Sequence, residues 1–250
     1  MSIRHRFRIR ALTALVAASC GMVVSPVIGQ QVDPAVQAYR QALADKDLNP
    51  GLLIVDQGKE LFYKKDGPKQ ASLEGCDFGL GPGVLKGAFA QMPRYMPDTG
   101  RVEDVEARLL HCMVTLQGKD PDQIKAKRFA NETKNERNTD WEKIVAYVAA
   151  QSDGMPLKMA ESPQVREAVR LGEYLFYKTV GPMDFSCATC HAEDGKRIRL
   201  QSLANVTSKA DAQNVMRAWP TYRVSHSAVR TMQHRMWDCM WQMRLPDVDM

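Results

Sequence analysis

The chain has 250 residues, of which 44% are hydrophobic and 25% are charged, and its formal net charge is +5 at pH 7. Four arginines and no acidic residue stand in the first ten positions, so the chain without them carries only about +1. This balance, with no basic run interleaved with aromatic residues, argues against nucleic acid as a partner. The length is enough for two small domains, and no low-complexity tract is present.

The N-terminus has the features of a secretion signal. Its basic start is followed by an apolar stretch of 14 residues, 11–24, which is too short to span a bilayer comfortably. We expect a signal peptide over 1–30 with cleavage near 29–31, export to the periplasm and no stable membrane anchor. An uncleaved anchor and a lipoprotein attached at Cys20 are the alternatives.

The remaining chain has the patterns of helices, and strand alternation is scarce. A capping Asp or Ser precedes proline at 33–34 and 162–163, and glycines end two helical patterns at 118 and 154. Val229 and four methionines recur at helical spacing near the C-terminus. The patterns predict an all-α protein with helices over about 33–47, 52–64, 102–117, 139–151, 162–178 and 227–244.

Two parts of the chain repeat each other. Residues 58–64 (Gly-Lys-Glu-Leu-Phe-Tyr-Lys) match 172–178 (Gly-Glu-Tyr-Leu-Phe-Tyr-Lys) at an offset of 114, which also relates Cys76 to Cys190. After a length difference of 13 residues, an offset of 127 relates Arg108 to Arg235 and Cys112 to Cys239. We therefore predict two tandem related domains, 45–153 and 158–250, joined at the breaker-rich segment 153–156.

Residues 187–191, Cys-Ala-Thr-Cys-His, form the attachment motif of a c-type haem. Two thiols at this spacing reach both vinyl groups of one porphyrin, and the adjacent histidine ligates the iron. We expect one haem bound covalently to Cys187 and Cys190, with His191 as the proximal ligand, in a cytochrome c domain. A redox dithiol or half a zinc site is the alternative, but no second Cys/His pair has zinc spacing.

Five cysteines remain beyond the leader, and two of them would hold the haem. The first domain has Cys76 without a second cysteine or a histidine behind it, so we predict a cytochrome c-like domain without haem. In an oxidising periplasm Cys76 and Cys112 would form a disulfide. Closing this loop would stabilise the fold by about 3–4 kcal/mol in the chain-entropy model. Two free buried thiols are the alternative.

Cys239 is then an odd thiol, and it lies 48 residues after His191, a reasonable distance for the distal ligand of the haem iron. Electron carriers ordinarily use methionine there. The competing side chains nearby are Met232, Met236, Met240, Met243, His226 and His234. We favour Cys239, because the repeat pairs it with Cys112 and so specifies a cysteine at this point.

Arg235 precedes Cys239 by four residues, which places both on one face of a helix. Its guanidinium would favour the Cys239 thiolate, and it could hold a sulfonate or sulfate group through forked hydrogen bonds. An ordinary ion pair of Arg235 with Asp238 or Glu193 is the alternative.

The block at 235–246, Arg-Met-Trp-Asp-Cys-Met-Trp-Gln-Met-Arg-Leu-Pro, closely resembles the SoxA family, the cytochrome subunits of the periplasmic sulfur-oxidation system. The resemblance extends across the mature chain and includes residues 76–83 and 93–95. Members of the family carry one or two haems in this subunit. Because the first domain lacks a Cys-x-x-Cys-His motif, the chain resembles the one-haem type.

The resemblance implies an L-cysteine S-thiosulfotransferase, which couples thiosulfate oxidatively to a cysteine of the carrier protein SoxYZ and passes two electrons to haem. It implies that Cys239 is both the distal haem ligand and the catalytic sulfur, carried as a persulfide, and that Arg235 binds the anionic substrate. It also implies a heterodimer with the small cytochrome SoxX, and we expect a positive, solvent-open mouth near Cys239. An electron-transfer cytochrome c without sulfur chemistry of its own is the alternative function.

Overall fold

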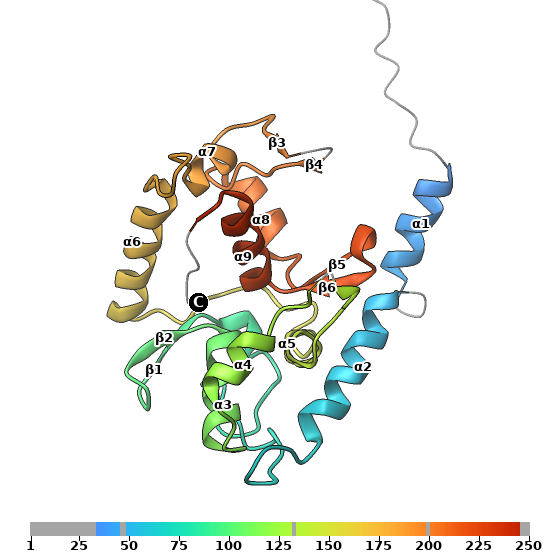
Figure 1. The fold of residues 1–250 in the computed structure, drawn as a ribbon, viewed down its shortest axis with the longest axis vertical. Coiled ribbons are helices and arrows are strands. Elements are labelled where there is room, and N and C mark those ends of the chain that lie inside the picture. The colour runs from blue at the N-terminus through green and yellow to red at the C-terminus, as the bar shows by residue number, and fades with distance from the viewer. Residues whose placement is uncertain (1–33, 46–48, 132–133, 199–200, 246–250) are drawn as a thin grey trace, which may run out of the picture. The chain divides into compact units, whose positions relative to one another are not determined.

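The computed structural model describes residues 34–45, 49–131, 134–198 and 201–245, so the expected signal peptide and Asp33 lie outside the described residues. The chain divides into residues 1–41 and a compact unit of residues 42–250, and helix α1 (Pro34–Ala44) crosses this boundary. The unit 42–250 carries both halves of the repeat (Figure 1). None of the described helices is long and apolar enough to cross a membrane.

Among its described residues, the first half of the repeat has the helices α2 to α5, the 3-10 turn η1 and a short hairpin. Its helices begin where side chains cap the free backbone N–H groups. Asn49 accepts a hydrogen bond from Gly51 N at 2.8 Å, and Asp104 accepts one from Ala107 N at 2.8 Å. The elements are α2 (Pro50–Tyr63), η1 (Phe89–Gln91), β1 (Arg94–Met96), β2 (Arg101–Glu103), α3 (Val105–Thr115), α4 (Pro121–Lys127) and α5 (Asp140–Ala150).

The second half also begins with a helix and contains a hairpin followed directly by a helix, but its other elements differ from those of the first half. Ser162 caps its first helix and Thr231 its last, each accepting a backbone hydrogen bond at 3.1 Å. The elements are α6 (Pro163–Tyr177), α7 (Cys187–His191), β3 (Arg197–Ile198), β4 (Gln201–Ser202), α8 (Lys209–Met216), β5 (Thr221–Arg223), η3 (Val224–His226), β6 (Ala228–Arg230) and α9 (Met232–Gln242).

The protein is mostly helical, as predicted, with three small antiparallel two-stranded sheets in the described residues. The predicted starts of the helices at 102 and 227 are wrong, because short strands precede α3 and α9. Gly100 and Ser227 adopt left-handed backbone conformations, with φ of 66° and 48°, and turn the chain into these strands. The helix can then begin only after the strand, at a new cap residue.

The repeat is visible in the structure at the offsets found in the sequence. The hairpin β1–β2 pairs Arg94 with Glu103, and β5–β6 pairs Thr221 with Arg230, 127 residues later at both positions. The helices that follow, α3 and α9, each have 11 residues. Isolated bridges at 66–71 and 180–185 differ by 114 residues. The two halves therefore share one structural plan.

The two halves interlock. Helix α6 packs against β1 and β2 of the first half, and α2 contacts β6 of the second half. Within the first half, α2 and α5 pack so closely at Gly58 that a Cβ there would overlap the carbonyl oxygen of Lys143. The division into domains at 45–153 and 158–250 stays a prediction.

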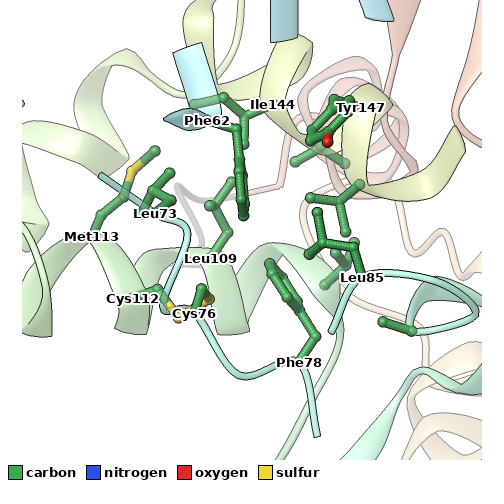
Figure 2. Close-up of a cluster of buried hydrophobic side chains, with 14 of the residues drawn as sticks. Phe62, Leu73, Cys76, Phe78, Leu85, Leu109, Cys112, Met113, Ile144 and Tyr147 are labelled. Carbon is green, nitrogen blue, oxygen red and sulfur yellow. A yellow bond between two sulfur atoms is a disulfide. The ribbon is translucent and has the colours of Figure 1, made fainter. Parts of the chain in front are cut away.

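The main buried core lies in the first half and encloses the predicted disulfide (Figure 2). Cys76 and Cys112 are joined with a Cα–Cα distance of 5.6 Å, and both are almost fully buried. The disulfide belongs to the same buried cluster as the aromatic rings of Phe62, Phe78 and Tyr147 and side chains of α3 and α5. The predicted Cys76–Cys112 disulfide is thus confirmed, and it is part of the core of a half that has no haem motif.

Candidate haem and cysteine site

The five residues of the Cys-Ala-Thr-Cys-His motif form the short helix α7. Ser186 and Thr189 cap its start reciprocally: Thr189 N donates to Ser186 Oγ at 3.1 Å, and Ser186 N donates to Thr189 Oγ1 at 3.0 Å. This turn puts Cys187 and Cys190 on one side of the helix, three residues apart. Both thiols are free, Cys187 exposed and Cys190 half-buried, so both are available for attachment to one flat group.

His191 is oriented by a backbone contact that the sequence did not indicate. Its Nδ1 lies 3.0 Å from the carbonyl oxygen of Ala204. A carbonyl oxygen can only accept, so Nδ1 carries a proton, and in the neutral ring Nε2 then has the lone pair. Metal-bound histidines use this arrangement, in which a second partner fixes the ring and its tautomer. His191 is therefore prepared to bind a metal through Nε2.

Cys239 is a half-buried free thiol on α9, and it lies within electrostatic range of both α7 cysteines. Burial raises the pKa of Cys239, and the guanidinium of Arg235 lowers it by a smaller amount. Asp238, Cys187 and Cys190 each raise this pKa further. The structure thus places the three predicted site cysteines within electrostatic range of one another. Arg235 does lower the pKa of Cys239, as predicted, but burial raises this pKa by more, so the net effect disfavours the thiolate.

Arg235 forms the ion pair that was the alternative to an open anion site. Its Nη1 lies 2.5 Å from Asp238 Oδ2. Its counterpart Arg108 is instead turned into the first half, where Nη1 lies 2.8 Å from Asp98 and 3.5 Å from Glu103. The Arg108 side chain is 6% exposed and the Arg235 side chain 16%. Arg108 thus has two acidic partners, whereas Arg235 has one and is more exposed to solvent.

One of the histidines that competed for the iron is occupied by other contacts. His234 is buried, and its Nδ1 lies 2.6 Å from Oε1 of Glu142, a fully buried carboxylate on α5. Phe129 stacks on the His234 ring with centroids 4.7 Å apart. His234 therefore ties α9 to α5, and its burial beneath the stacked Phe129 ring, rather than its Nδ1 contact, argues against it as the distal ligand. Glu142 and Phe129 were not singled out from the sequence, because only the fold brings them to α9.

The surroundings of α7 fit a large apolar group. In the described part of 158–250, the buried hydrophobic side chains are Val165, Ala228 and Val229. On α6, beside α7, Val169 and Leu175 are 51% and 52% exposed. A haem carries the apolar surface that such side chains cover. Among the described residues, no group of three or more His, Cys, Asp or Glu is placed to hold a metal ion.

The chain is similar to known proteins over most of its length. The family model described as the SoxA/TsdA cytochrome c domain matches residues 57–157, the half that holds the disulfide. The L-cysteine S-thiosulfotransferase subunit SoxA of Hydrogenophilus thermoluteolus is 43% identical over 237 residues, 92% of this chain and 85% of that protein. The protein of the same name from Hydrogenobacter thermophilus is 35% identical over 223 residues, 87% of this chain and 79% of its own length.

A solved structure has a similar fold. The crystal structure of SoxXA from P. pantotrophus superposes with a TM-score of 0.64 and covers 85% of this chain and 73% of that chain. Its sequence identity is 23%, so the likeness concerns the fold. This fold agrees with the predicted cytochrome c architecture.

Proposed function

This chain belongs to the SoxA family, and we propose that it is the haem-carrying subunit of an L-cysteine S-thiosulfotransferase. The observation that carries this proposal is that Cys239, one helical turn from Arg235 on α9, lies within electrostatic range of Cys187 and Cys190 in the Cys-Ala-Thr-Cys-His helix. Such a place can hold an anion, a reactive sulfur and an electron acceptor together.

One c-type haem would be held by thioether bonds to Cys187 and Cys190, with His191 Nε2 as the proximal ligand. Cys239 is our proposed distal ligand, because it is the thiol of α9 within electrostatic range of α7. A haem bound there would supply a one-electron acceptor. The half-buried setting of Cys239 limits contact of its sulfur with water and other thiols.

Thiosulfate is the proposed substrate, and the cysteine of a SoxYZ-like carrier is the proposed acceptor. The Cys239 sulfur, as a thiolate or as its persulfide, bonds to the outer sulfur of thiosulfate, and two electrons leave one at a time to c-type haem, from which the partner cytochrome would carry them away. The carrier thiolate then attacks that sulfur, forms the carrier S-thiosulfonate and releases the Cys239 sulfur with its electron pair. Overall, a carrier thiol and thiosulfate give the carrier S-thiosulfonate, one proton and two electrons. This sequence is nucleophilic catalysis with a sulfur nucleophile.

Arg235 would bind the sulfonate group of the substrate. Its planar guanidinium can offer two parallel N–H groups to two oxygens, which a lysine cannot do. Because Asp238 accepts from Nη1, the remaining N–H groups of Arg235 would be the ones that meet the substrate.

The proposed assembly and location are those that the resemblance to the family implies. We propose a heterodimer with a SoxX-like small cytochrome c, export to the periplasm after removal of residues 1–30, and two tandem cytochrome c-like domains. The first domain, without haem, would act as a scaffold with its core organised around the Cys76–Cys112 disulfide. The interlocked helices and hairpins of the two halves support a rigid arrangement of this kind.

The substitution Cys239→Met separates this function from plain electron transfer. Methionine can ligate haem iron but has no thiol to form a sulfur–sulfur bond. We expect the variant to keep its haem and exchange electrons, while thiosulfate-dependent modification of the carrier falls to background. A variant that modifies the carrier at the wild-type rate would show that Cys239 is not the catalytic sulfur.

A further inference from the structure

A groove of about 910 Å³ runs beside α9 on the side that carries Arg235. Its walls come from α4 and the segment behind it, the start of α5, the hairpin β5–β6 and α9; we refer to it as the α4–α9 groove. Arg235 lines the groove, and Cys239 follows it by one helical turn. Cys239 itself does not line the groove, so a ligand that contacts Arg235 there lies about one helical turn from the proposed catalytic sulfur.

The groove has an excess of positive charge. Seven of its lining side chains are cationic, and three are carboxylates. The first half supplies Lys125, Lys127, Arg128 and Lys134, and the second half supplies Arg223, Arg230 and Arg235. Asp238 and Arg235 form an ion pair, Asp140 lies 3.4 Å from Lys143, and Arg230 lies 3.6 Å from the buried Glu142, so the excess of positive charge comes mainly from the remaining cations. The field inside such a groove attracts anionic ligands and raises their rate of association.

The size and the aromatic wall indicate what kind of anion fits. Phe129 and Trp237 lie in contact along the wall, with ring centroids 5.8 Å apart, and Trp241 is 64% exposed. A volume of 910 Å³ is that of a site for a drug-sized ligand or a peptide segment, far larger than a single sulfur oxyanion. Aromatic and cationic side chains together suit a peptide that has acidic and apolar residues.

We propose that the α4–α9 groove binds an acidic segment of the carrier protein during sulfur transfer. This inference rests on the proposed function, which requires that a carrier cysteine reach Cys239. A carrier segment held in the groove would place the residues that follow it beside Arg235, one turn from the reactive sulfur. The groove would then select the carrier, while Arg235 and Cys239 act on thiosulfate.

Binding of a labelled ten-residue oligoglutamate to the haem-loaded protein, alone and with its partner cytochrome, tests the groove without requiring turnover. The test variant is Lys127→Glu/Lys134→Glu, because both side chains are exposed on the groove wall. The matched control is Lys59→Glu/Lys65→Glu, which makes the same charge change at exposed positions outside the groove. Fluorescence anisotropy at low and physiological salt gives the affinities.

We expect the groove variant to bind the oligoglutamate about tenfold more weakly than wild type at low salt, with the control close to wild type. The difference should shrink as salt screens the charges. With the carrier as substrate, the same variant should raise KM about tenfold and leave kcat unchanged.

Equal binding by all three proteins would overturn the proposal, even if the enzyme transfers sulfur normally. Loss of partner-cytochrome binding in the groove variant would also overturn it, because the groove would then belong to that interface. Failure of wild type to transfer sulfur, with selective oligoglutamate binding intact, would instead refute the proposed function and leave an acidic-peptide groove.

Discussion

The Gln233 side chain near the start of α9 donates to both carboxylate oxygens of Asp104, at 3.0 and 2.8 Å. Asp104 caps α3, and Gln233 is the repeat counterpart of Glu106, the second residue of α3. In return, Glu106 accepts a hydrogen bond from Gln233 N at 3.3 Å and another from the Thr231 side chain. The N-termini of the two equivalent helices thus meet, and the helix that carries Cys239 is anchored to the half without haem.

Removing this contact should uncouple the two halves measurably. In a double-mutant cycle of Asp104→Ala with Gln233→Ala, we expect a coupling free energy of unfolding of about 1 kcal/mol, from hydrogen bonds to a charged carboxylate. Asp120→Ala removes the cap of α4, which does not contact Gln233, and serves as the control. Chemical denaturation of the four variants measures the cycle. A coupling as small as that of Asp120 with Gln233 would show that the contact does not join the halves.

Glu106 should make stability depend on pH. Burial, and secondarily the charge of Asp104, raise the pKa of Glu106 to about 7, above its ordinary value of 4.5. The folded state therefore binds the proton more tightly than the unfolded state. Protonated Glu106 therefore contributes roughly 3 kcal/mol to the free energy of unfolding. This contribution is fully present below pH 4.5 and is lost as the pH rises through about 7.

The substitution Glu106→Gln should remove this loss, since an amide does not ionise. We expect the unfolding free energy of wild type relative to Glu106→Gln to fall between pH 5 and pH 8, as measured by urea denaturation. Trp141 Nε1, which donates to Glu106 at 2.8 Å, gives a local fluorescence probe of the same transition. A difference that is constant with pH would contradict the raised pKa.

The Cys76–Cys112 disulfide should provide much of the stability of the first half. It closes a separation of 36 residues, and the chain-entropy model gives about 4 kcal/mol for such a loop. We expect Cys76→Ala/Cys112→Ala to unfold at a lower urea concentration, with the α7 haem motif still able to take its haem. Reductant under denaturing conditions should lower the midpoint of wild type and leave the variant unchanged. Equal midpoints without reductant would refute a stabilising role.

Arg235 should act on the substrate through its forked geometry. We expect Arg235→Ala to raise KM for thiosulfate about 10- to 100-fold with an unchanged haem spectrum, and Arg235→Lys to recover only part of this loss. Arg108→Ala, at the equivalent position in the first half, should lower stability and leave the KM of the folded enzyme unchanged. If Arg235→Ala loses haem instead, Arg235 has a structural role.

Sequence patterns predicted the helices that have strong local signals. Ser162-Pro163 marks the start of α6 and Thr139 the start of α5, because capping and proline act within one turn. The strands were missed because three residues such as Arg101–Glu103 take their strand conformation from a partner elsewhere in the chain. The short helices α4 and α8 lack a long apolar period and were missed for that reason.

The candidate site was predictable where chemistry follows from spacing. The haem motif and the odd cysteine were readable directly, and the disulfide followed from the repeat and is confirmed. Whether Arg235 pairs with Asp238 or Glu193 could not be chosen, because both are compatible with the sequence and only side-chain positions decide. The buried state of Glu106 arises where residues 127 positions apart meet, so no local pattern indicates it.

Non-reducing peptide mass spectrometry of the haem-loaded protein after exposure to thiosulfate tests whether Cys239 is the catalytic sulfur. We predict a haem on the Cys187–Cys190 peptide, a linked Cys76–Cys112 pair and at least one extra sulfur atom on the Cys239 peptide. A Cys239 peptide that stays an unmodified thiol, or that is linked by a disulfide to Cys187 or Cys190, would contradict the claim.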